Sequence, residues 1–194
     1  MRLRGWPVLF AAAVLLVTSS ATGAAADPDV GSYWHDGKAE LDGYRLTVER
    51  YGHARHGRVV AIYVTEPFSR TKHVKLDDPS KSPAEALDVL KLNLVRDFPT
   101  GIYDYHTIVS TFVGSADFTP LKKAFSSSEW CGQVYEELNV RGSKLSQRVA
   151  SYFEGETSER DLGIPSRGVQ EDDLFQNRRI RRAPPRRPRG TLLR

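Results

Sequence analysis

Cysteine is nearly absent from this sequence, because its 194 residues contain one, Cys131. A single cysteine permits no internal disulfide, so a hydrophobic core must hold the fold together. There is no C-x-x-C motif. We predict that Cys131 lies inside a β-strand and packs as a small hydrophobe, with Trp130 pointing to the opposite face. A reactive or intermolecular thiol is the alternative.

The short motifs of well-known catalytic and cofactor sites are also missing. The sequence has no H-E-x-x-H, no Cys/His quartet, no G-x-S-x-G, no phosphate-binding loop and no G-x-G-x-x-G that opens a helix. Its only close histidine pair, His53 and His56, flanks Arg55, which opposes a bound cation, so we interpret both as solvated loop residues. We therefore predict no metal, no cofactor and no catalytic residue, and favour a protein that is not an enzyme.

Apolar runs of membrane-spanning length are lacking. The longest, at positions 8–17, rises about 15 Å as a helix, whereas a bilayer core is about 30 Å thick. It follows Arg2 and Arg4 and precedes an A-x-A site at positions 24–26, an order typical of secretory signals. We predict that residues 1–26 are a signal peptide and that the protein is exported, to the periplasm or as a secreted protein of a bacterial envelope. An uncleaved anchor is the alternative.

Acidic residues are missing from residues 176–194, where eight residues are Arg and three are Pro. We predict a disordered tail there. All Asp and Glu lie in residues 27–175, so that part is net acidic although the whole chain is basic. The tail is a basic arm for an anionic surface, a solvated tail, or out-of-frame or truncated sequence that replaces missing strands; we favour the third. We expect no nucleic-acid partner.

Residues 27–175 alternate apolar and polar side chains with period two, which is typical of strands with one wet face. We interpret 52–57 as a polar turn, Pro67 as the end of a strand and Ser126–Ser128 as a loop, and we favour a strand over a helix within 85–98. The expected strands are 43–51, 58–66, 87–95, 100–114, 129–139 and 143–156.

These six or so strands predict one mainly β domain over residues 27–175. We expect a curved antiparallel sheet or an incomplete open β-barrel with few short helices. Aromatic side chains and a histidine on these strands are candidates for lining a ligand groove, with packing in the core as the alternative. The candidates are Tyr103, Tyr105, His106, Trp130 and Tyr135.

The segments "YWHDGKAELDGYRLTVERYG" (33–52), "DVLKLNLVRDFPTG" (88–101), "GIYDYHTIVSTF" (101–112), "FSSSEWCGQVYEELN" (125–139) and "SYFEGE" (151–156) resemble a family of uncharacterised bacterial exported proteins and lipoproteins. Its members often carry the name septum formation inhibitor Maf. That name implies nucleotide hydrolysis, for which this chain has no S-x-S-P-R-R motif. Members of the family continue beyond the last segment, so the resemblance implies that C-terminal strands are missing here.

Three functions are compatible with these features. The first is a non-enzymatic envelope protein that holds lipid or another apolar small molecule on a concave sheet face, with peripheral membrane contact as a further expectation. The second is an exported hydrolase that uses cross-strand histidines and carboxylates, such as His106. The third is the Maf-like nucleotide hydrolysis that the resemblance implies.

Overall fold

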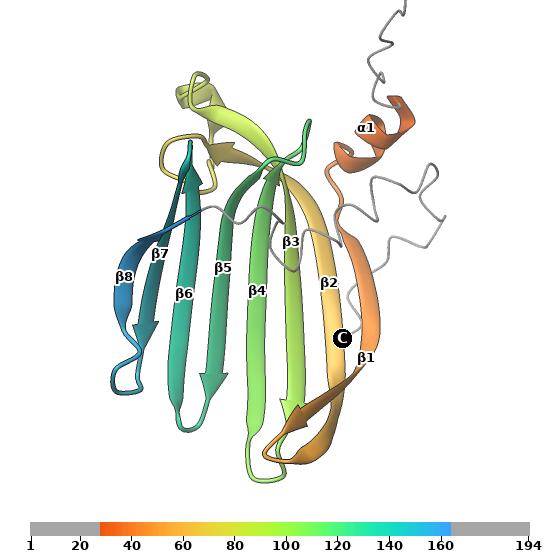
Figure 1. Ribbon diagram of the computed structural model, residues 1–194. Coiled ribbons are helices and arrows are strands. Elements are labelled where there is room, and N and C mark those ends of the chain that lie inside the picture. The colour runs from red at the N-terminus through yellow and green to blue at the C-terminus, as the bar shows by residue number, and fades with distance from the viewer. Residues whose placement is uncertain (1–27, 164–194) are drawn as a thin grey trace, which may run out of the picture.

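One curved antiparallel sheet makes up nearly the whole described chain, as predicted (Figure 1). The structure is a computed structural model that describes residues 28–163. The predicted signal peptide and the predicted basic tail lie outside these residues. Eight strands follow one another in chain order across the unclosed sheet. They are β1 (Glu40–Arg50), β2 (His53–Ser69), β3 (Ala86–Pro99), β4 (Asp104–Gly114), β5 (Pro120–Glu129), β6 (Gly132–Arg141), β7 (Lys144–Ser151) and β8 (Ser158–Leu162). Besides the strands there are a short helix α1 (Pro28–Trp34) and a single 3-10 turn η1 (Pro79–Lys81).

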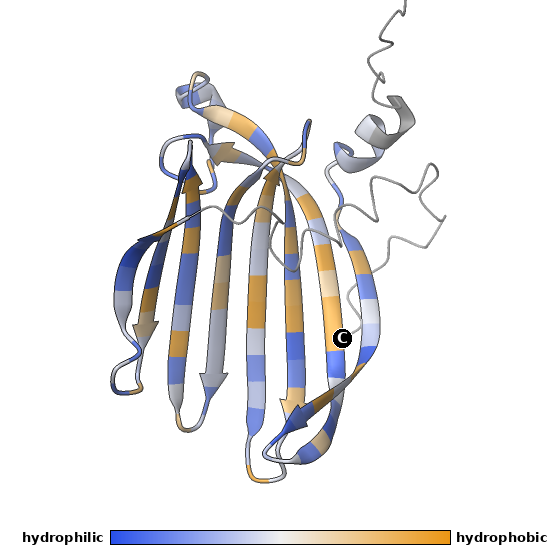
Figure 2. Ribbon diagram, in the orientation of Figure 1, coloured by the Kyte–Doolittle hydropathy of each residue, from blue (hydrophilic) through white to orange (hydrophobic). Residues whose placement is uncertain are grey.

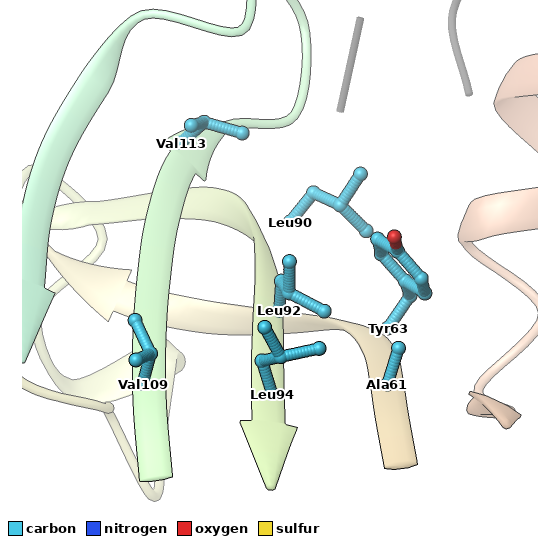
Figure 3. Packing of buried hydrophobic residues seen from close by; sticks show 7 residues of the cluster. All are labelled: Ala61, Tyr63, Leu90, Leu92, Leu94, Val109 and Val113. Atoms are coloured by element: carbon cyan, nitrogen blue, oxygen red, sulfur yellow. The ribbon is translucent and has the colours of Figure 1, made fainter. Parts of the chain in front are cut away.

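The sheet has two faces, and the strand register assigns residues to each. We call the face that carries Tyr63, Leu92 and Val109 the inner face. Leu92 pairs with Tyr63 on β2 and with Thr111 on β4. Because opposed residues point to the same face, this register assigns every second residue of each strand to the inner face. The inner face carries the buried core cluster on β2, β3 and β4 (Figure 3), which consists of Ala61, Tyr63, Leu90, Leu92, Leu94, Val109 and Val113.

The core occupies only part of the inner face. Trp34 of α1 packs against the cluster, with its ring centroid 6.0 Å from that of Tyr63, and Phe118 also contacts the cluster. Hydrophobic residues concentrate on β2, β3 and β4, whereas β8 is mostly hydrophilic (Figure 2). No residue of β5, β6 or β8 is fully buried. Within residues 28–163, no helix lies over the part of the inner face near the hairpin turns after β1, β3 and β5 (Figure 1).

Close approach of two strands helps to curl the sheet at this end. A Cβ atom on Gly57 of β2 would lie 2.1 Å from the carbonyl oxygen of Asp97 on β3, so only glycine fits without a backbone shift. The turn that precedes β2 has positive φ at both central residues, Tyr51 (56°) and Gly52 (71°). Such turns match the twist of paired strands. As a result, β1 crosses toward β3 and β4 at its C-terminal end (Figure 1).

The outer face is partly covered by the connection between β2 and β3. In this connection His73 is buried, and its Nδ1 lies 2.9 Å from Oδ1 of Asn139 on β6. Burial lowers the pKa of His73. Beneath it, Lys122 of β5 forms a 2.8 Å ion pair with Glu137 of β6 and donates a hydrogen bond to the carbonyl of His73. This polar network fastens the connection to the sheet.

Several local predictions were wrong. Cys131 does not lie in a strand but with Trp130 in the two-residue turn between β5 and β6, where the thiol is exposed. Ser126–Ser128 are not a loop but belong to β5, since their neighbours on β4 and β6 supply the ladder. There are eight strands, not about six. The unpredicted β8 has four polar residues and a single leucine, so its sequence gives little periodic signal.

The end and the start of β2 also differ from expectation. The strand runs through Pro67 to Ser69, because proline lacks a donor yet its carbonyl still accepts a hydrogen bond, here from Leu76 N at 2.9 Å. The predicted polar turn at 52–57 is shorter than expected, since β2 already begins at His53. By contrast, the strand favoured over a helix within 85–98 is confirmed as β3.

Candidate ligand-binding pocket

A pocket of about 690 Å³ lies on the inner face beside the core, where α1 does not reach. This volume falls within the range of about 300–1,000 Å³ that is usual for small-molecule sites. Strands β1, β3, β4, β5 and β6 contribute to its walls, together with the connection between β7 and β8. Its apolar lining consists of Leu46, Val48, Phe98, Phe125, Val134 and Phe153.

A row of polar side chains crosses the pocket between these apolar groups. Arg96 on β3 pairs in register with Thr107 on β4, which pairs with Ser127 on β5. All three residues line the pocket. Their side chains make no hydrogen bond or ion pair with any residue of the described range 28–163. The row is thus a line of hydrogen-bond donors without partners among the described residues.

One end of the pocket is closed by hydroxyl groups and an arginine. Arg50 Nη2 donates a 2.7 Å hydrogen bond to the Tyr105 hydroxyl, and the guanidinium lies 4.9 Å from the centre of the Tyr105 ring. The Tyr51 hydroxyl lies 2.8 Å from the hydroxyls of both Tyr103 and Tyr105. On its other side the Tyr105 ring is stacked on Phe98, with centroids 5.0 Å apart. These contacts hold the turns after β1 and β3 together.

The electrostatics of this cluster keep the Tyr105 hydroxyl protonated. Burial, together with a hydrogen bond to Glu129, raises the pKa of Tyr105 to about 12. The pKa of Tyr103 is raised by its hydrogen bonds to Tyr51 and Cys131. One carboxylate oxygen of Glu129 is buried and has no hydrogen bond. The cluster is therefore a set of neutral donors around an arginine and a glutamate, with no activated nucleophile and base in contact.

A second polar group lies on the outer face of β2, β3 and β4. Nδ1 of His106 donates a 2.5 Å hydrogen bond to Asp97, which also forms a 3.1 Å ion pair with Arg58. Burial alone would raise the pKa of Asp97, but the hydrogen bonds from His106 and Arg58 more than offset it and lower that pKa. Ser128 pairs with His106 in register on β5. A shallow depression of about 540 Å³ surrounds Asp97 and His106.

The five predicted groove residues divide between the closed end of the pocket and the outer face of the sheet. Tyr103, Tyr105 and Trp130 lie together near the closed end, where the rings of Tyr103 and Trp130 are stacked with centroids 6.1 Å apart. Of these, Tyr105 lines the pocket. His106 lies on the outer face, and so does Tyr135, whose hydroxyl donates a 2.7 Å hydrogen bond to Glu137.

The sequence did not single out the row of donors or the far walls of the pocket. Arg96 directly follows the predicted strand 87–95, and its even spacing from Leu94 and Phe98 was the available signal that it faces inward. Val48 and Phe153 come from distant segments, which only the curvature of the sheet brings together.

No helix within residues 28–163 is long and apolar enough to cross a membrane. Across the same residues, His, Cys, Asp and Glu form no group of three or more that would hold a metal ion. Comparison with protein-family models, with curated proteins and with solved structures found no match to the chain.

Proposed function

We propose that this protein is a non-enzymatic binding module that holds an apolar ligand with a polar end in the pocket of the inner face. The observation that carries the proposal is the apolar surface beside the core that residues 28–163 leave partly exposed, formed by Val48, Phe125, Val134 and Phe153 around a volume of about 690 Å³. Apolar side chains that line a concavity favour a ligand that removes them from water.

The position of the pocket also supports binding rather than catalysis. Its floor is formed by the paired strands β3, β4 and β5, whose backbone groups bond to one another. Such a floor is rigid and offers side chains, not backbone donors, to a ligand. The polar groups of the pocket stand between apolar ones, an arrangement that orients a ligand.

Binding of Nile red, a neutral apolar fluorophore, to the purified full chain tests this proposal. We expect saturable binding that Val134→Trp weakens at least about tenfold, because the indole fills part of the pocket volume. Gln133→Trp is the matched control, since its neighbouring position is exposed on the outer face of β6. Wild-type protein that shows no saturable binding, or a folded Val134→Trp that binds as tightly as Gln133→Trp, would overturn the proposal.

A second candidate function is hydrolysis on the outer face, favoured by the hydrogen bond from His106 to Asp97 and by Ser128 opposite His106. A histidine oriented by a carboxylate is the usual base for a serine nucleophile. Turnover of p-nitrophenyl butyrate that is lost in both His106→Gln and Ser128→Ala would support it. Background hydrolysis that neither change alters would reject it. The nucleotide hydrolysis implied by the resemblance stays a prediction.

A further inference from the structure

We infer that the ligand is an anionic amphiphile, a molecule with an apolar chain and a carboxylate or phosphate head, whose head binds Arg96, Thr107 and Ser127. This inference rests on the proposed function, because it specifies the polar end of the ligand for the same pocket.

The geometry of the row favours a single anionic group. Arg96, Thr107 and Ser127 occupy directly opposed positions on adjacent strands, and opposed residues of antiparallel strands lie about 4.5–5.5 Å apart. Three donors on one line can therefore converge on one head group with several oxygen atoms. A guanidinium matches the planar geometry of a carboxylate or phosphate, and the hydroxyls add further donors.

The two arginines of the pocket, Arg96 and Arg50, differ in whether their guanidinium groups already have a hydrogen-bond partner. The guanidinium of Arg50 is already hydrogen-bonded to the Tyr105 hydroxyl at 2.7 Å. Arg96 has no such partner within residues 28–163, and its side chain is partly buried among pocket residues. A partly desolvated cation without a partner loses free energy of hydration that an anionic ligand would restore.

The carboxylates of the pocket do not cancel this preference. Glu129 accepts the hydrogen bond of the Tyr105 hydroxyl, and Glu156 accepts a 2.6 Å hydrogen bond from the Ser151 hydroxyl. Glu49 stands at a position of outer-face parity on β1 and is exposed. Apart from one oxygen of Glu129, which has no hydrogen bond, Glu129 and Glu156 already accept hydrogen bonds, whereas the donors of the row have no partner within residues 28–163.

The surroundings of the row strengthen the interaction. Val109 and Phe125, which pair across β4 and β5, lie on one side of the row. Phe98 and Tyr105, which pair across β3 and β4, lie on the other side. Apolar neighbours exclude water and lower the local dielectric constant, so charge-assisted hydrogen bonds become stronger. The same side chains offer contact to an apolar chain that leaves the head group.

Displacement of Nile red from the full chain by four amphiphiles of equal chain length tests the inference. They are dodecanoate, dodecyl phosphate, dodecan-1-ol and dodecyltrimethylammonium, each used below the concentration at which it forms micelles. We expect one or both anions to compete at least about tenfold more strongly than the alcohol, and the cation to compete most weakly. The tighter of the two anions identifies the head group.

Variants then assign the preference to the row. Arg96→Met should abolish the advantage of the anions over the alcohol while the alcohol still competes, and Arg96→Lys should keep part of that advantage. Thr107→Val and Ser127→Ala should each reduce it by a smaller factor. Arg45→Met is the matched control, because Arg45 is an exposed arginine of outer-face parity on β1.

The outcomes separate this inference from the proposed function. Equal competition by anions and alcohol, a preference for the cation, or an anion preference that persists in Arg96→Met would overturn the inference and leave the apolar site in place. Absence of saturable Nile red binding would overturn the proposed function and the inference with it. An anion preference that Arg96→Met removes and Arg45→Met retains supports both.

Discussion

Arg50 of β1 and Tyr105 of β4 are joined by a 2.7 Å hydrogen bond although β2 and β3 lie between their strands in the sheet. On a flat sheet the two strands would stand about 14 Å apart, the width of three strand spacings. Arg50 is also displaced along β1 from Leu46, the residue in register with Tyr105. The contact therefore measures how strongly the sheet curls toward its inner face. It also fixes the distance between the β1 wall and the β4 floor of the pocket.

Tyr105→Phe should destabilise the protein by roughly 1–3 kcal/mol, because it removes the acceptor of a charged donor while the ring still stacks on Phe98. Urea unfolding followed by circular dichroism measures the change. Tyr152→Phe is the control, since Tyr152 is exposed and its change should stay within about 0.5 kcal/mol. Equal effects of the two substitutions would show that the Arg50 contact does not stabilise the curl.

Gly57→Ala should lower the free energy of unfolding, whereas Gly43→Ala should leave it unchanged or raise it. A Cβ atom on Gly57 would lie 2.1 Å from the backbone oxygen of Asp97, whereas one on Gly43 meets nothing within 4 Å. We expect Gly57→Ala to cost roughly 1–3 kcal/mol through backbone displacement. We expect Gly43→Ala to be neutral or stabilising by up to about 1 kcal/mol, because it restricts the unfolded chain. The two free energies of unfolding decide the matter, and a harmless Gly57→Ala would mean that β2 and β3 are not so closely apposed.

Acid should weaken the network on the outer face through Glu137. Burial alone would raise the pKa of Glu137, but hydrogen bonds from Lys122, Tyr135 and Asn139 lower it to about 2, from 4.5. A depressed carboxyl pKa stabilises the fold above pH 4.5, and this contribution is lost as the pH falls from there toward about 2.

Glu137→Gln should therefore flatten the pH dependence of stability. Between about pH 6 and about pH 3, we expect the wild type to lose roughly 1–2 kcal/mol more than the variant. Urea midpoints at the two pH values give this difference. Glu154→Gln, at an exposed position between β7 and β8, should keep the wild-type dependence. Parallel losses in the wild type and Glu137→Gln would rule out a role for this carboxylate.

Cys131 should react with dithiobis(nitrobenzoate) in the native protein at a rate close to that of the unfolded chain, because the thiol is exposed in a turn. Absorbance at the start of the reaction, with and without urea, provides the comparison. A thiol packed in a strand would react only after unfolding. That result would restore the interpretation of Cys131 as a core residue.

The sequence predicted those strands whose own residues alternate. In β4, Val109, Thr111 and Val113 fall on the inner face because period two is unbroken there. In β5, serines occupy both faces at positions 126–128, so only the neighbours on β4 and β6 make this segment a strand. The alternation of apolar and polar residues was also taken to continue across Trp130 and Cys131, so the turn between β5 and β6 was not predicted. The aromatic residues of the closed end were found as a group, whereas the pocket itself depends on curvature, which no local pattern encodes.

Every strand of this sheet pairs with its neighbours in sequence, from β1 to β8. Each new pairing therefore closes only a short loop, which keeps the entropic barrier to folding small for a β protein. The sheet can grow in the order in which a ribosome releases it, one hairpin at a time on a single advancing edge. The strands that bury the core come early, and the mostly hydrophilic β8 comes late. During synthesis, the unpaired edge strand thus becomes more hydrophilic and less prone to aggregate as the chain lengthens.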